Sequence, residues 1–100
     1  MEKIILPRGE GKTTKLIQIS HDTWTYILVV DGKRQREVAN LARKMEVDIP
    51  YPVTLEDYLR SKFHGSFIRR ILIDDADDVL KALFPNLEIT AITMTEHRES

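Results

Sequence analysis

Residues 6–14, LPRGEGKTT, carry the residue types from which a phosphate-binding loop is built. Gly9 and Gly11 leave backbone N–H groups free to wrap around phosphate oxygens, because glycine has no Cβ to obstruct a close approach. Lys12 supplies an ammonium group for terminal phosphates, and Thr13 supplies a hydroxyl group for a divalent cation. The segment therefore predicts a site for a phosphorylated ligand.

The segment departs from the usual loop pattern, G-x-x-x-x-G-K-[ST], because Leu6 stands where the first glycine belongs. That position lies at the turn from strand to loop rather than at the phosphates, and Gly9 can supply flexibility from inside the loop. We expect the Glu10 side chain to point outward and its N–H to point inward. Thr14 adds a hydroxyl suited to an α-phosphate. The alternative is a glycine-rich turn that starts a helix and binds nothing.

The elements around this loop alternate between strands and helices along the chain. Apolar and β-branched runs predict strands, helical spacing of apolar residues predicts helices, and proline or glycine separates them. Thr54 is the expected N-cap of the third helix, with Asp57 three residues later and Gly65 at its end. The expected strands are 3–6, 25–30, 69–74 and 87–93, and the expected helices are 12–21, 33–46, 55–64 and 76–84.

This alternation predicts an α/β fold with three αβα layers, in which about four parallel strands have helices on both faces. Residues 25–30, TYILVV, are nearly all apolar, as expected of a strand that is buried on both sides. In such sheets ligands bind beyond the carboxyl ends of the strands. The glycine-rich loop and the acids after residue 73 both lie at such ends.

The length, composition and charge of the chain limit the classes of function that it can have. One hundred residues suit one domain, 1–100, and the 42% apolar and 31% charged residues are typical of a globular protein. The net charge of −1 gives no general attraction to nucleic acid or anionic membranes. No apolar run suits a membrane span and no signal peptide is recognisable, so we expect a soluble, cytoplasmic protein without a membrane partner. There is no cysteine, and we expect three dispersed histidines to bind no metal: His21, His64 and His97.

Several segments together resemble the P-loop NTPases of the RecA-like, helicase-type class. RRILIDDADDVL is similar to their second acidic motif, and DDAD at 74–77 resembles their D-E-A-D box. TMT at 93–95 resembles their S-A-T motif, and GEGKT recurs in the preprotein-translocation motor of the class. LVVDGKRQREVANLA loosely resembles a segment that touches single-stranded nucleic acid. The resemblance covers nearly the whole chain as the first half of a motor domain.

The resemblance implies a strand order of 1-4-3-2 and the cofactors ATP and Mg²⁺. Thr13 and Asp74 would hold Mg²⁺, while Lys12 and Asp75 would be catalytic, Asp75 by orienting or deprotonating the attacking water. Thr93 and Thr95 would sense the γ-phosphate. The nucleotide would contact the whole loop: Arg8, Gly9, Glu10, Gly11, Lys12, Thr13 and Thr14.

The alternative for the acids is purely structural. A cluster of acids such as 74–78 can serve only as a negative first turn that complements the dipole of the helix after it. The chain also shows no second RecA-like domain and no motif that carries an arginine finger, and we expect Arg98 to be solvated. Four basic residues are expected to form a solvated helix face or to bind nucleic acid weakly: Arg34, Arg36, Arg43 and Lys44.

The sequence thus favours a domain that binds ATP, with slow Mg²⁺-dependent hydrolysis, and acts with a second copy, another protein or nucleic acid. The alternative is a non-catalytic interaction domain that retains the fold to bind a partner. A small-molecule kinase ranks last, because no spare segment exists to form an acceptor site or a closing lid. The preference for ATP over GTP follows from the resemblance alone.

Overall fold

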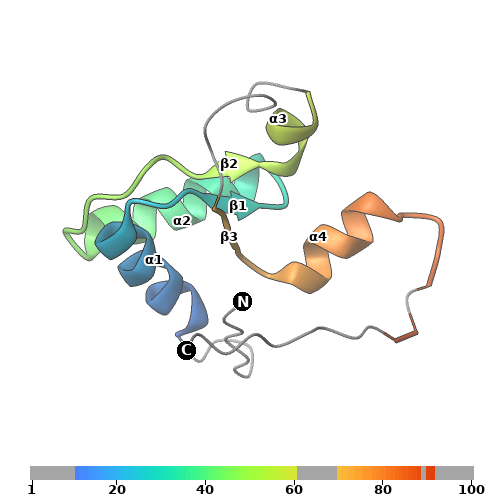
Figure 1. Cartoon of the computed structure of the whole chain (residues 1–100), viewed down its shortest axis with the longest axis horizontal. Helices are drawn as coiled ribbons and strands as arrows, with labels where there is room; N and C mark the ends of the chain where they lie inside the picture. The colour runs from blue at the N-terminus through green and yellow to red at the C-terminus, as the bar shows by residue number, and fades with distance from the viewer. Residues whose placement is uncertain (1–10, 61–69, 89, 92–100) are drawn as a thin grey trace.

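The computed structural model describes residues 11–60, 70–88, 90 and 91 (Figure 1). Helices and strands alternate through them, and the α/β class is confirmed. None of the helices in these residues is long and apolar enough to cross a membrane. The elements are α1 (Lys12–Thr23), β1 (Ile27–Val29), α2 (Gly32–Lys44), β2 (Val53–Thr54), α3 (Leu55–Leu59), β3 (Leu72–Ile73) and α4 (Ala76–Leu83).

The three strands form a parallel sheet with the order β2-β1-β3. The central strand β1 pairs on one side with β2, where Leu28 lies opposite Val53, and on the other side with β3, where Leu28 lies opposite Ile73. All three residues of β1 are buried. The prediction of an apolar strand covered on both faces is therefore confirmed, within narrower bounds than 25–30.

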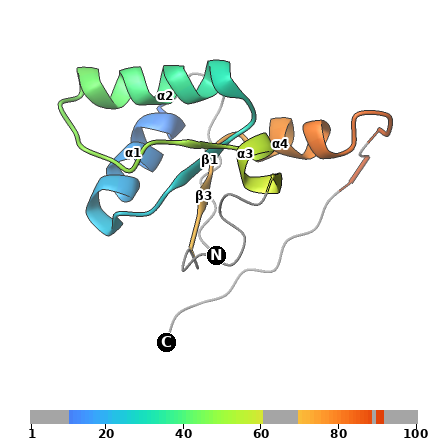
Figure 2. The same ribbon diagram turned by 90° about the horizontal axis from the view of Figure 1, so that it is seen from above.

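Two hydrophobic cores lie on opposite faces of the sheet, because neighbouring side chains of a strand point to opposite sides. Ile27 and Val29 of β1 pack with residues of α1 and α2, whereas Leu28 packs with residues of α3 and α4. Figure 2 shows these two pairs of helices on opposite sides of β1. The first core contains Ile17, Ile27, Val29, Val38 and Ala42. The second contains Leu28, Val53, Leu55 and Val79. Helices thus cover both faces of the described sheet.

Capping residues set the starts of the helices. The Thr54 hydroxyl accepts a hydrogen bond from the backbone N–H of Asp57 at 3.0 Å, which confirms Thr54 as the N-cap of α3. The Asp31 side chain accepts from the N–H of Arg34 at 2.9 Å and caps α2 in the same way. Helix α1 follows Gly11, whose φ of 78° is a left-handed conformation that glycine adopts without strain.

Two parts of the sheet differ from the predicted strands. Val53 and Thr54 form β2 beside β1, although Pro52 and Pro50 were expected only to interrupt the chain. Proline lacks an N–H but does not prevent pairing by the β-branched residues that follow it.

The second difference concerns the predicted strand 87–93. Of its described residues, 87, 88, 90 and 91, none lies in a strand. The N–H of Leu87 donates to the carbonyl oxygen of Phe84 at 3.2 Å, so it serves a turn after α4 rather than a sheet. The rest of that strand and the strand 3–6 lie outside the described residues. The predicted helix 55–64 is shorter in the structure, because α3 ends at Leu59 with Arg60 as its C-cap, so Gly65 does not close it. The predicted adjacency of strands 25–30 and 69–74 does hold, as β1 and β3.

The first core predicts a large loss of stability when Ile17 is truncated. Ile17 is fully buried against Ile27, Val29 and Val38, so Ile17→Ala should lower the free energy of unfolding by about 2–5 kcal/mol. Leu83 is 41% exposed, and Leu83→Ala should cost less than about 1 kcal/mol. Urea unfolding of both variants checks this pair; equal losses would contradict the assignment of the core.

Candidate functional site

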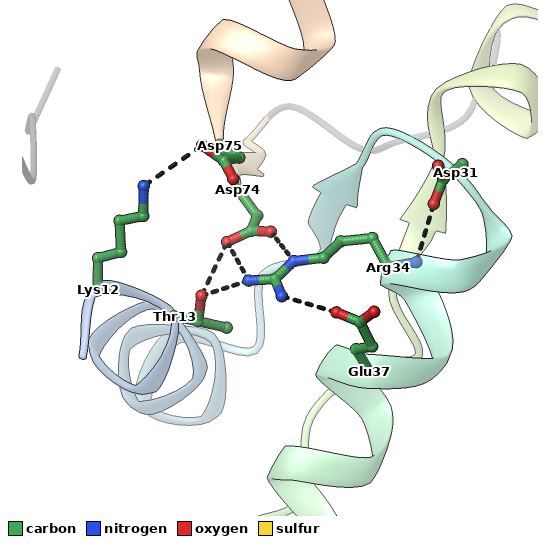
Figure 3. A network of polar contacts seen from close by, with 7 residues as sticks. All are labelled: Lys12, Thr13, Asp31, Arg34, Glu37, Asp74 and Asp75. Atoms are coloured by element: carbon green, nitrogen blue, oxygen red, sulfur yellow. Dashed lines mark hydrogen bonds and ion pairs between the residues drawn. The ribbon is translucent and has the colours of Figure 1, made fainter. Parts of the chain in front are cut away.

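The candidate site lies where the N-terminus of α1 meets the carboxyl ends of β1 and β3 (Figure 3). Lys12 and Thr13 open α1, and Asp74 and Asp75 directly follow β3. About sixty residues of chain separate the two pairs, but their side chains are in contact. The structure therefore gathers the described members of the predicted loop and the predicted acidic pair at one edge of the sheet.

Asp74 occupies the centre of the site and is almost completely buried, with 1% of its surface exposed. Its backbone N–H donates to the carbonyl oxygen of Leu28 at 3.0 Å, which continues the pairing of β3 with β1. Its side-chain Oδ1 accepts a hydrogen bond from the Thr13 hydroxyl at 3.2 Å. This contact brings together the two oxygen groups that the resemblance assigned to Mg²⁺, although the assignment itself stays a prediction.

Arg34 reaches into the site from the first turn of α2. Its Nε donates to Asp74 Oδ2 at 2.7 Å, and its Nη2 lies 3.4 Å from Asp74 Oδ1. The same Nη2 donates to the Thr13 hydroxyl oxygen at 2.6 Å. Nη1 donates to Glu37 Oε2 at 3.0 Å, one turn along the helix. The expectation that Arg34 belongs to a solvated basic face is therefore wrong.

The physical reason for this correction is the burial of Asp74. A carboxylate removed from water is costly unless a countercharge and hydrogen-bond donors replace the lost solvent. The guanidinium of Arg34 provides both in a two-point geometry. The pKa of Arg34 is raised above its ordinary value, chiefly by the hydrogen bond with Asp74 and against the opposing effect of burial. Arg34 thus remains a permanent positive charge at this place.

Lys12 and Asp75 form a second ion pair beside the first. Lys12 Nζ lies 3.3 Å from Asp75 Oδ1, and both side chains are about one quarter exposed, at 27% and 24%. Asp75 has a left-handed backbone with φ of 55°, which is uncommon outside glycine, although aspartate and asparagine adopt it more readily than most residues. Its side chain makes no capping bond to α4. The Asp75 carboxylate therefore points to Lys12 rather than serving the helix end.

The remaining predicted residues are placed as follows. Gly11 is the N-cap of α1, and Thr14 is exposed on its first turn. Asp77 and Asp78 occupy the first turn of α4, where their charge suits the helix dipole, so the structural alternative describes these two acids. Arg36, Arg43 and Lys44 are exposed on α2. Six predicted residues lie outside the described part: Arg8, Gly9, Glu10, Thr93, Thr95 and Arg98.

The sequence reasoning missed the roles of Arg34 and Glu37. One signal was available, since Arg34 stands three residues after the Asp31 cap and therefore lies at the carboxyl end of β1. Asp74 ends the neighbouring parallel strand, and the carboxyl ends of parallel strands share one edge of the sheet. A cation and a buried acid at adjacent strand ends would be expected to pair.

The donor chemistry of the site suits a hard cation. In the described residues no group of three or more His, Cys, Asp or Glu side chains could hold a metal ion. Mg²⁺, however, commonly takes only one or two carboxylates and completes its shell with water and phosphate oxygens. Thr13 and Asp74 provide such oxygen donors 3.2 Å apart, but Arg34 engages both of them. The oxygen atoms of Thr13 and Asp74 are thus of the type that Mg²⁺ prefers, but the guanidinium of Arg34 contacts them in this structure.

Comparison with known proteins identifies no relative. No family model matches the chain, and no curated protein or solved structure is similar enough to count as a match.

The network around Asp74 predicts an effect on stability that a helix-end charge would not have. Asp74→Asn keeps the shape of the side chain but weakens the charged hydrogen bonds with Arg34, so the free energy of unfolding should fall by about 2 kcal/mol. The matched control is Asp77→Asn, an exposed acid in the first turn of α4, which should lose less than about 1 kcal/mol. Chemical denaturation measures both values; equal losses would mean that Asp74 acts only on the helix dipole.

Proposed function

We propose that this chain binds a nucleoside triphosphate, ATP in preference, with its phosphates at the N-terminus of α1. The observation that carries the proposal is the meeting of Lys12 and Thr13 with Asp74 and Asp75 across the sheet edge. A helix N-terminus with a lysine and a hydroxyl beside a strand-end acid is the arrangement that the P-loop pattern requires. The left-handed Gly11 at the start of α1 agrees with that pattern.

Each residue has a task in this proposal. The first N–H groups of α1, which have no partner within the helix, would donate to phosphate oxygens. Lys12 would turn its ammonium from Asp75 to the β- and γ-phosphates. Thr13 and Asp74 would hold Mg²⁺, which when bound neutralises charge on the β- and γ-phosphates.

Slow hydrolysis is part of the same proposal. Lys12 occupies the Asp75 carboxylate in the structure, at 3.3 Å. When Lys12 moves to a phosphate, Asp75 becomes available to orient or deprotonate a water molecule. Aspartate is one methylene shorter than the glutamate of the resembling motors, and this shorter reach favours a low rate.

A partner is the remaining part of the proposal. Large apolar side chains are exposed at the end of α4 and just beyond it: Leu83, Phe84 and Leu87. Exposed groups of this kind are common where proteins associate. These side chains favour a second copy or another protein as the partner. Nucleic acid is less favoured, because Arg34, one of the basic residues considered for it, is engaged by Asp74.

One observation favours a second candidate, a non-catalytic interaction domain. Among the described residues, no buried side-chain nitrogen or oxygen lacks a hydrogen-bond partner. The site is therefore satisfied electrostatically without a ligand, as a domain that has no nucleotide to bind would require. Titration with labelled ATP in the presence of Mg²⁺ separates the two candidates.

Lys12→Ala should weaken binding of labelled ATP by about tenfold or more, because an ammonium–phosphate contact is lost. The fold should remain, since the partly exposed pair with Asp75 contributes at most about 1 kcal/mol. Lys15→Ala, an exposed lysine one turn along α1, is the matched control and should bind as the parent does. Fluorescence anisotropy gives the affinities, and circular dichroism checks the fold. Equal affinity in Lys12→Ala and the parent would exclude the phosphate-binding role.

Asp75→Asn should leave ATP binding intact and reduce phosphate release by about tenfold or more, because the general base or water-orienting group is lost. Asparagine tolerates the left-handed backbone of position 75, so the substitution should not strain the turn. A coupled phosphate-release assay on the purified chain measures the rate. If the parent binds ATP without releasing phosphate, the hydrolytic part of the proposal fails while the binding part stands.

A further inference from the structure

The guanidinium of Arg34 lies on the oxygen atoms that a divalent cation would need. Arg34 Nε and Nη2 approach both oxygens of Asp74, at 2.7 and 3.4 Å, and Nη2 also donates to the Thr13 hydroxyl at 2.6 Å (Figure 3). The Thr13 hydroxyl in turn donates to Asp74 Oδ1. One organic cation thus uses the lone pairs of both groups.

Simultaneous occupancy by two cations is unfavourable here for steric and electrostatic reasons. Asp74 is 1% exposed, so little space surrounds its carboxylate. Two positive charges a few ångströms apart in a partly desolvated site repel each other strongly, and one carboxylate compensates only one charge. A metal ion at Thr13 and Asp74 therefore requires that Arg34 leave them.

Arg34 can leave without a change in the backbone. Its backbone N–H is fixed by the Asp31 cap, so the movement involves only the long side chain. That side chain is 29% exposed and already touches Glu37, which is 47% exposed. Glu37 lies one turn along α2 and provides an alternative carboxylate partner nearer to solvent.

We propose that Arg34 is the resident cation of the site and determines how readily the site accepts a divalent metal ion. Arg34 and Mg²⁺ hold Asp74 and Thr13 in turn, and never together. In a chain that has bound nucleotide, the exchange of Arg34 for Mg²⁺ rests on the proposed function. In the chain without nucleotide, the exchange of cations at Asp74 does not depend on that function.

The exchange is tested with Mn²⁺ alone, a spectroscopic probe that favours the same oxygen ligands as Mg²⁺. Electron paramagnetic resonance measures free Mn²⁺ during titration of the parent, Arg34→Gln, Arg34→Lys and the control Arg36→Gln, in which an exposed arginine of the same helix is neutralised. We expect Arg34→Gln to bind Mn²⁺ about tenfold or more tightly than the parent, since the competing charge is gone. Arg36→Gln should match the parent. Adding Asp74→Asn to Arg34→Gln should abolish the gain.

Thermal unfolding with and without Mn²⁺ gives a second readout, because an ion that binds only the folded chain raises the melting temperature of the protein. Mn²⁺ should raise the melting temperature of Arg34→Gln more than that of the parent. If Arg34→Gln does not fold without metal, Mn²⁺ should restore folding, and Arg34→Lys, which retains the charge but loses the two-point contact, should fold and show a smaller gain.

Equal Mn²⁺ affinity in the parent and the Arg34 variants would overturn the proposal, as would failure of Mn²⁺ to bind or rescue any of them. The same preparations titrated with labelled ATP keep the two proposals apart. A gain in Mn²⁺ affinity without ATP binding would support the exchange of cations and contradict the nucleotide-binding function. If the chain binds ATP and its Mn²⁺ affinity is the same with and without Arg34, the nucleotide-binding function is supported and the exchange of cations is contradicted.

Discussion

The buried carboxylate of Asp74 is the constraint on which the polar end of this molecule depends. At 1% exposure it has lost its water, so the protein itself must provide the charge and the hydrogen bonds. Thr13 comes from α1 and Arg34 from α2, while Asp74 follows β3. One side chain thus ties two helices to the end of a strand. The positions of Lys12 and Asp75, next to these residues, follow from the same arrangement.

The two hydrophobic cores fix the positions of the elements that carry these polar residues. Strand β1 is the centre of the sheet, and its two sets of side chains are buried against helices on opposite faces. Helix α1 packs through Ile17 and α2 through Val38 on the same face, so the N-terminal turns that carry Thr13 and Arg34 are placed side by side. The geometry of the site comes from the packing of the elements that carry it.

Local patterns in the sequence were sufficient for most of the elements and for part of the site. Apolar spacing predicted α2, the preceding glycines α1 and the following Pro85 the end of α4, each to within about two residues. Thr54 was recognised as a cap because capping is a local hydrogen bond. The meeting of Lys12 and Thr13 with the acids was foreseeable, because parallel strands bring their carboxyl ends to one edge.

What the patterns missed depends on long-range pairing. A two-residue strand such as β2 carries no periodicity and exists only because β1 offers an edge to it. Arg34 shares its helix with exposed basic residues, and only the burial of Asp74, forty positions away, distinguishes it.

The charges of the site also decide what a ligand must do to enter it. Lys12 and Arg34 are paired with Asp75 and Asp74, and Arg34 also contacts Glu37, so these two cations and three acids leave one net negative charge. The polyphosphate of the proposed ligand would bring negative charge to this edge and would be attracted only after a cation is freed from its acid. Its observed affinity is then the intrinsic affinity reduced by the fraction of molecules in which a cation is free. The exposed pair with Lys12 opens at little cost, whereas the buried pair with Arg34 opens only if another cation replaces it. Under the proposed function, Lys12 would therefore be the first contact for an anion, and Arg34 would control whether a metal ion accompanies it.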